Sequence, residues 1–153
     1  MSIFLATTTD IQSIVSLVND AYRGNGEGWT NEAHLLQGPR TSAEEVGRLL
    51  ADGVILMHGL DGCVYLQPRA DALYVGMLSV LPSRQGAGIG KQLLAAAGAF
   101  ARERGYTRIR ITVLSRRPEL IAWYERHGYV RSGEALPFPF GDRLELIVLE
   151  LTW

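Results

Sequence analysis

The feature that most constrains the fold is a glycine-rich turn between a β-rich run and a long helical pattern. Residues 73–80 are rich in β-formers, and Leu81-Pro82 ends that run. Residues 85–91 then read Gln-Gly-Ala-Gly-Ile-Gly-Lys. Apolar residues recur at helical spacing through residues 88–104, and Gly105 is well placed to end a helix. The sequence therefore predicts a strand, a glycine-rich turn and a helix in that order.

This turn is suited to an anion. Successive backbone N–H groups beside glycines can converge with little side-chain obstruction, and the helix macrodipole adds positive potential. Arg84 and Lys91 flank the turn with formal positive charges. A pyrophosphate fits such a place, although the glycines alone leave open a turn that binds nothing.

Two widespread phosphate motifs do not match these residues. A Walker loop requires Gly, four residues and then Gly-Lys-Ser/Thr, whereas position 85 is Gln and Lys91 is followed by Gln92. The dinucleotide fingerprint requires a third glycine at position 91, and no early strand begins a parallel nucleotide-binding half. We therefore expect neither a Walker site nor a Rossmann site.

The remaining pattern alternates short strands with helices. Strands are predicted at residues 3–6, 54–58, 63–67, 108–114, 129–132 and 144–151, and helices at 11–22, 43–52 and 118–128. The Asp-Gly pair at 61–62 indicates a hairpin. Residues 24–38 read as a loop-rich lid in which 29–36 can add a helical turn, and 137–141 form a second loop. This order predicts a mixed α/β layer, mostly antiparallel, with parallel pairing at a strand–helix–strand crossover.

Composition indicates one ordinary globular domain over residues 1–153. Apolar residues make up 47% of the 153 residues and charged residues 20%, which allows a packed core without disulfides or metals. The formal net charge of -1 argues against a nucleic acid partner. Cys63 is the single cysteine, expected to be a small buried residue, so no internal disulfide forms. Without a signal-like start or a run of 18 apolar residues, we expect no membrane partner and a cytoplasmic location.

Two sequence blocks together resemble a known family. The pattern Gln/Arg-x-x-Gly-x-Gly/Ala occurs at residues 85–90, directly after the strand-ending segment 78–82. The second block, Ile-Ala-Trp-Tyr-Glu-Arg-His-Gly-Tyr, occupies residues 121–129. They resemble the coenzyme A loop and the later helix of the Gcn5-related N-acetyltransferase (GNAT) superfamily. The order of elements agrees over nearly the whole chain, and the detailed match covers residues 78–91 and 120–130.

The resemblance implies an acyl-CoA N-acyltransferase fold of the α/β (α+β) class, with about six to seven mostly antiparallel strands and about four helices. Its central strands, 73–80 and 108–114, would splay so that their gap admits the pantetheine arm. The implied coenzyme A-binding residues are Leu78, Val80, Arg84, Gln85, Gly86, Ala87, Gly88, Ile89, Gly90 and Lys91. One departure is Arg117, where many members carry Asn; it could either reach a phosphate or lie in solvent.

The activity implied is transfer of an acetyl group from acetyl-CoA to a primary amine of a small molecule or peptide by direct attack. Tyr124 stands at the family's position for the acid that protonates the departing thiolate. By periodicity alone Tyr124 reads as a core tyrosine on the face of Ile121. The base that deprotonates the amine is not identified. The rival reading is a non-catalytic acyl-CoA-binding sensor or subunit of the same fold.

The resemblance places the amine acceptor at the lid. The substrate-binding candidates there are Glu27, Trp29 and Glu32, with His34 beside them, and each also reads as a solvated lid residue. The aromatic segment 138–140 either closes this pocket or packs on a sheet edge. His58 and His127 have weak claims because neither has a metal-like partner, so no metal is expected. The acceptor's identity is not readable, and pairing of a closing strand across a homodimer stays open.

Overall fold

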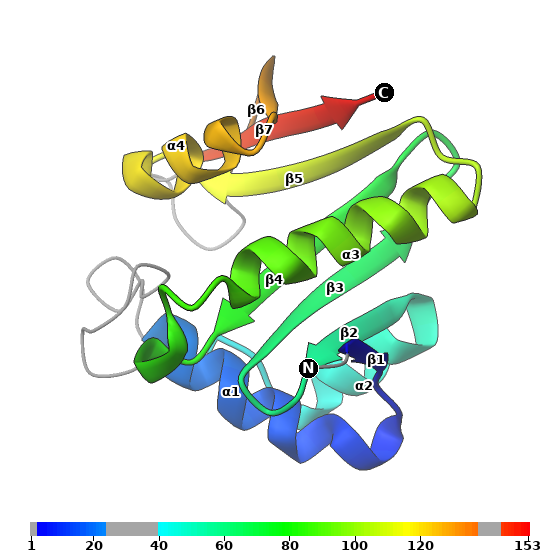
Figure 1. Cartoon of the computed structure of the whole chain (residues 1–153), viewed down its shortest axis with the longest axis vertical. Coiled ribbons are helices and arrows are strands. Elements are labelled where there is room, and N and C mark those ends of the chain that lie inside the picture. The colour runs from blue at the N-terminus through cyan, green and yellow to red at the C-terminus, as the bar shows by residue number, and fades with distance from the viewer. Residues whose placement is uncertain (1–2, 24–39, 138–144) are drawn as a thin grey trace.

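The computed structural model describes residues 3–23, 40–137 and 145–153 (Figure 1). Within these ranges one sheet has the order β1-β2-β3-β4-β5-β7-β6. The strands are β1 Ile3–Leu5, β2 Val54–His58, β3 Gly62–Pro68, β4 Leu73–Val80, β5 Arg108–Leu114, β6 Val130–Pro137 and β7 Glu145–Thr152. The α-helices are α1 Ile11–Arg23, α2 Ala43–Asp52, α3 Ile89–Glu103 and α4 Pro118–Arg126, with 3-10 turns at Thr8–Asp10 and Pro82–Arg84. The predicted mixed, mostly antiparallel sheet with four helices is confirmed.

The helices cover opposite faces of the sheet because its strands alternate their apolar side chains. On β2, Leu56 packs in the cluster that contains α3 and α4 residues. Its neighbours Ile55 and Met57 pack in a second cluster with α1 and α2. Helix α3 runs from β4 to β5 along the sheet (Figure 1), and this crossover explains why β4 and β5 are the one parallel pair among the strands of the described residues. No helix among the described residues is long and apolar enough to cross a membrane.

Strand β6 is longer than predicted. The sequence indicated a strand over residues 129–132, whereas β6 extends to Pro137 because its pairing with β7 resumes at Ala135 after an irregularity. Nearly every residue of β6 is exposed, so the strand carries no alternation of buried and exposed side chains. The strand predicted from the sequence therefore ended at residue 132, where the alternation of apolar and polar residues ended.

Strand β4 contains a bulge. Before it, Leu73 and Val75 pack toward α3, and after it Leu78 and Val80 do so, which leaves one residue too many for strict alternation. Met77 packs instead in the α1 cluster, and the register with β3 shifts at this point. The extra residue re-aims the second half of β4 relative to its first half.

Strands β4 and β5 pair only at their beginnings. The parallel register runs from Leu73 opposite Ile109 to Val75 opposite Ile111. Beyond Val75 no pairing with β5 occurs among the described residues, so residues 76–80 present an open edge on that side. The predicted divergence of the two central strands is confirmed.

Cys63 is predicted to be unreactive in the folded protein. The thiol on β3 is fully buried, and burial raises its pKa from 9.0 to about 12. Above pH 9 the unfolded chain loses this proton before the folded chain does, so this thiol's contribution to stability declines with rising pH. At about pH 8 we expect no reaction with Ellman's reagent until guanidinium unfolds the chain. Rapid reaction of native protein would contradict the burial of this thiol.

Candidate active site

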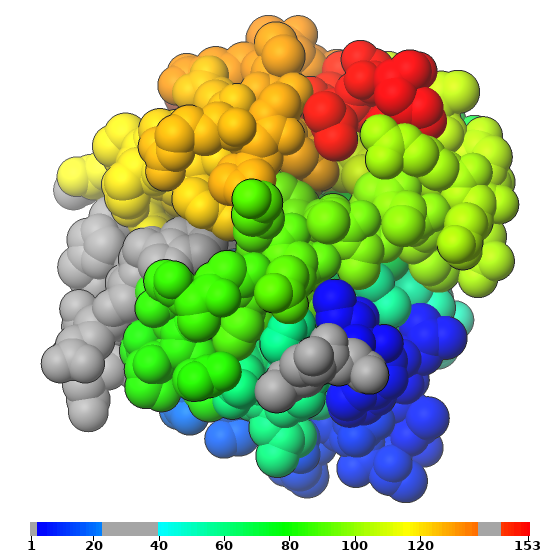
Figure 2. Space-filling model, in the orientation of Figure 1, coloured from blue at the N-terminus to red at the C-terminus, as the bar shows by residue number. Residues whose placement is uncertain are grey.

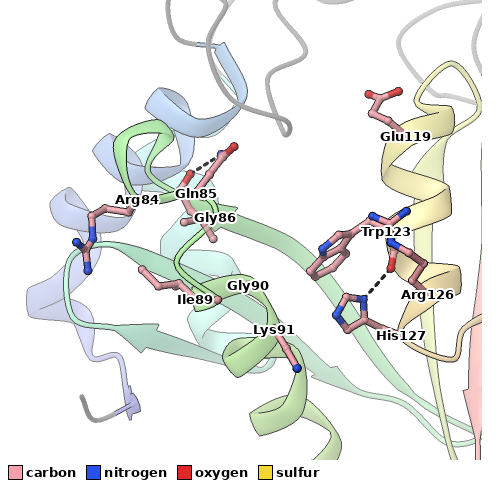
Figure 3. A pocket seen from close by; sticks show the side chains of 12 residues that line it. Arg84, Gln85, Gly86, Ile89, Gly90, Lys91, Glu119, Trp123, Arg126 and His127 are labelled. Carbon is pink, nitrogen blue, oxygen red and sulfur yellow. Dashed lines mark hydrogen bonds between the residues drawn. The ribbon is translucent and has the colours of Figure 1, made fainter.

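A pocket of about 490 Å³ lies between the start of α3 and helix α4 (Figure 3). The lining residues are Val80, Arg84, Gln85, Gly86, Gly88, Ile89, Gly90, Lys91, Glu119, Trp123, Arg126 and His127. In the space-filling view the green segment before α3 and the orange α4 region lie beside each other on one face (Figure 2). The open edge of β4 reaches this pocket through Val80.

The glycine turn has the conformation that an anion cradle requires. Gly86 and Gly88 have φ angles of 90° and 84°, in the left-handed region that costs other residues about 1 kcal/mol or more. A Cβ built on either glycine meets nothing within 4 Å, so the space beside the turn is open. Gly88 is also the N-cap of α3, and no side chain of the described residues caps this helix. The first N–H groups of α3 therefore form the positive end of the helix dipole and have no side-chain capping acceptor among the described residues.

Cationic side chains lie on both walls of the pocket, which are formed by α3 and α4. Lys91 comes from α3 and Arg126 from α4, while Arg84 also lines the pocket with its Nε 3.2 Å from Asp61 Oδ2. Glu119 adds a carboxylate, whose Oε1 lies 2.6 Å from Arg117 Nε. Because that carboxylate and Asp61 each have an arginine partner, the pocket as a whole favours an anion. These features fit a diphosphate.

One face of α4 forms the second wall. Trp123 and His127 lie with ring centroids 4.3 Å apart, and His127 Nδ1 donates to the Trp123 carbonyl oxygen at 2.7 Å. Glu119, Trp123 and Arg126 of this wall were not predicted from the sequence as site residues. The signal was present, because residues 119, 123 and 126 recur at helical spacing on the side opposite the apolar stripe.

Most of the coenzyme A-binding residues predicted from the sequence meet at this pocket. Val80, Arg84, Gln85, Gly86, Gly88, Ile89, Gly90 and Lys91 line it. Leu78 lies deeper, buried in β4, and Ala87 is exposed outside the lining. The Gln85 side chain turns back, and its Nε2 donates to the Val80 carbonyl at 3.0 Å.

Tyr124 lies on the inner face of α4, next to the wall residue Trp123. It is 5% exposed and does not belong to the pocket lining. Its ring packs edge-on to Trp123 at 5.1 Å and to Tyr129 at 5.7 Å, between centroids. The neighbouring Tyr129 hydroxyl is buried without a hydrogen-bond partner among the described residues, and burial raises the pKa of Tyr129. The acid role of Tyr124 stays a prediction.

Arg117 is not in solvent. It occupies the N-cap position of α4 without a side-chain capping bond and is only 1% exposed, so the solvated reading is wrong. Burial of a guanidinium requires a partner, and Glu119 supplies one. Sequence inspection missed this because an arginine beside Pro118 looks like an ordinary surface residue.

The remaining candidates divide into two groups. His58 is buried, with its Nε2 2.6 Å from Gln92 Oε1, and the described residues contain no cluster of three His, Cys, Asp or Glu side chains that could hold a metal. The lid and loop candidates lie outside the described residues. They are Glu27, Trp29, Glu32, His34 and the segment 138–140.

Comparison with known proteins identifies the class. The acetyltransferase (GNAT) domain family matches residues 43–131, which include the glycine turn and α4. This chain belongs to the GNAT acetyltransferase family, and the resemblance seen in the sequence is confirmed. Membership supports acyltransferase activity with an acyl-CoA. No curated protein matches the sequence.

Solved structures share the fold over nearly the full chain. The ribosomal-protein-S18-alanine N-acetyltransferase of Escherichia coli aligns with TM-score 0.76 and 19% identity, covering 99% of this chain and 92% of its own. The PaiA N-acetyltransferase of Thermoplasma acidophilum, in complex with coenzyme A, aligns with TM-score 0.77 and 16% identity over 100% of both chains. A putative acetyltransferase of Salmonella typhimurium, with acetyl-CoA, gives TM-score 0.69 and 19% identity, covering 99% and 93%. At these identities the likeness concerns the fold.

Proposed function

We propose that this protein is a single-domain N-acetyltransferase that moves an acetyl group from acetyl-CoA to a primary amine of a small molecule or peptide. The observation that carries the proposal is the open edge of β4, which leads directly into a cation-lined pocket at the start of α3. An extended arm that ends in a diphosphate suits such a continuous path. Related structures with coenzyme A or acetyl-CoA support the same ligand.

The phosphate end is assigned to the glycine turn. N–H groups of the first turn of α3 would bind the diphosphate oxygens, and Lys91 and Arg126 would add charge from the two walls. The pantetheine arm would then extend along β4, where Leu78 and Val80 offer backbone groups as a neighbouring strand does. This arrangement directs the thioester toward the end of the gap beside α4.

The reaction is a direct transfer. The amine nitrogen attacks the thioester carbonyl carbon and forms the C–N bond while the oxygen carries negative charge. The C–S bond then breaks, the thiolate takes a proton from Tyr124, and the amine releases its proton to water or to a base. The Tyr124 phenolate regains a proton from solvent.

The test is release of free thiol from acetyl-CoA in the presence of an amine panel. The panel contains polyamines, lysine-containing peptides and peptides with a free N-terminal alanine, since a structural neighbour acetylates alanine of a ribosomal protein. We expect one coenzyme A thiol for each acetylated product seen by mass spectrometry, and none with control peptides in which every amine is already acetylated. Saturable acetyl-CoA binding with no thiol from any amine would favour the rival sensor.

A further inference from the structure

The bulge of β4 is held by two hydroxyl groups that the proposed transfer does not use directly. The Tyr22 hydroxyl, on the last turn of α1, donates to the Leu78 carbonyl at 2.7 Å, and this bond is buried. The Ser79 hydroxyl donates to the Met77 carbonyl at 3.0 Å, also buried. Two successive carbonyls at the bulge are therefore bonded by side chains rather than by a neighbouring strand.

The backbone next to these carbonyls is strained. Met77 has a φ angle of 52° and is the one non-glycine residue of the described ranges with positive φ. Such a residue costs about 1 kcal/mol or more and persists only where its surroundings fix it. Ser79 bonds the carbonyl of Met77 itself, and Tyr22 bonds the carbonyl of the next residue, so the two hydroxyls fix the peptide groups that follow the strained φ angle.

The direction of the hydrogen-bonding groups on β4 shows what the bulge presents to the gap. The Leu81 N–H donates to Asp61 on the β3 side at 2.8 Å. Because successive residues of a strand direct these groups to opposite sides, those of Val80 and Leu78 face the β5 side. There the Leu78 carbonyl is bonded to Tyr22 and the Val80 carbonyl to Gln85. Two acceptors on this edge are thus satisfied, while the N–H groups have no ladder partner on β5.

We propose that Tyr22 and Ser79 are positioning residues for acetyl transfer, which fix the bulge so that the gap-facing edge of β4 offers the thioester oxygen donors rather than acceptors. This inference rests on the proposed function. An unbonded Leu78 carbonyl would repel the negative charge that develops on the thioester oxygen, and the Tyr22 hydroxyl offsets that repulsion. Neither side chain needs to touch acetyl-CoA.

The chain offers a matched control for the Tyr22 hydroxyl. Tyr65 on β3 lies in the same buried cluster as Tyr22 and Met77, and its hydroxyl has no hydrogen-bond partner among the described residues. Tyr22→Phe and Tyr65→Phe thus remove the same atom from the same cluster. They differ in whether that atom bonds the bulge.

The experiment is isotope-edited infrared spectroscopy of acetyl-CoA labelled with carbon-13 at its carbonyl, bound to each protein. This readout needs no knowledge of the acceptor. We expect the bound carbonyl stretch of the wild type to lie below that of free acetyl-CoA, to move back toward the free value in Tyr22→Phe, and to stay in place in Tyr65→Phe. With an acceptor in hand, kcat of Tyr22→Phe should fall about tenfold while the KM for acetyl-CoA changes less than about twofold.

A carbonyl stretch that is the same in Tyr22→Phe and the wild type overturns the inference, as does a wild-type stretch equal to the free value. Should Tyr22→Phe prove too unstable to purify, Ser79→Ala removes the other hydroxyl and should move the stretch in the same direction by a smaller amount; no movement there is equally contrary. Failure of the wild type to bind acetyl-CoA instead refutes the proposed function. The binding titration that precedes the spectroscopy separates the two failures.

Discussion

Tyr124→Phe is expected to lower kcat for thiol release by about 100-fold, the lower end of what a positioned general acid contributes. The Kd for acetyl-CoA should change by less than about twofold, because the phenol is proposed to act on the departing sulfur and not on the bound ground state. Phenylalanine keeps the edge-on packing with Trp123 and Tyr129, so the fold should not change. Steady-state kinetics and titration calorimetry measure the two quantities.

Tyr129→Phe is the matched control. Its ring lies 5.7 Å from the Tyr124 ring, and its buried hydroxyl has no partner among the described residues. Removal of an unsatisfied buried hydroxyl should leave kcat unchanged and raise the melting temperature slightly. Equal activity of Tyr124→Phe and the wild type would remove Tyr124 from the mechanism.

Gly88→Asp should abolish useful acetyl-CoA binding while the protein stays folded. Aspartate tolerates a left-handed φ and is a favoured N-cap residue, and a Cβ at this position meets no atom within 4 Å. The carboxylate, however, would stand where the diphosphate is proposed to bind. Like charges about 4 Å apart repel by about 4 kcal/mol near a protein surface before salt screening, so we expect a loss of affinity of at least about 100-fold.

Gly133→Asp controls for the backbone and the charge. Gly133 lies on β6 with a φ of 89°, and a Cβ there also meets nothing within 4 Å. Both variants carry the same added charge and a similar left-handed φ, so their melting temperatures should be similar. Calorimetry should show near wild-type affinity for Gly133→Asp only. An equal affinity of Gly88→Asp and Gly133→Asp would move the diphosphate away from the glycine turn.

Local sequence signals predicted those parts of the fold in which apolar residues recur with the period of a strand or a helix, or in which glycines mark a turn. The strand, glycine turn and helix over residues 73–104 were predicted because apolar alternation, glycines and a helical stripe follow each other there. The same reasoning predicted the α3 wall of the pocket. It did not predict β6 beyond residue 132, because an exposed strand has no apolar face to reveal it.

The missed site features depend on contacts between distant segments. The Tyr22 bond to Leu78 joins residues 56 positions apart, and its partner is a backbone carbonyl that any sequence possesses. The burial of Arg117 is also a property of the folded chain, although its partner Glu119 lies only two residues away in the sequence. The bulge at Met77 is visible in the sequence as a break in the apolar alternation between Val75 and Leu78. That break can be interpreted as a bulge only when the pairing of β4 with β3 is known.

The most direct measurement is the titration of acetyl-CoA into the wild-type protein, the reference for the glycine variants. We expect saturable heat with one site per chain, and binding that weakens as salt rises because the proposed site holds the phosphate charges with Lys91, Arg126 and the start of α3. Correctly folded protein that gives no heat and no competition by coenzyme A would refute acetyl-CoA binding and the proposed function with it.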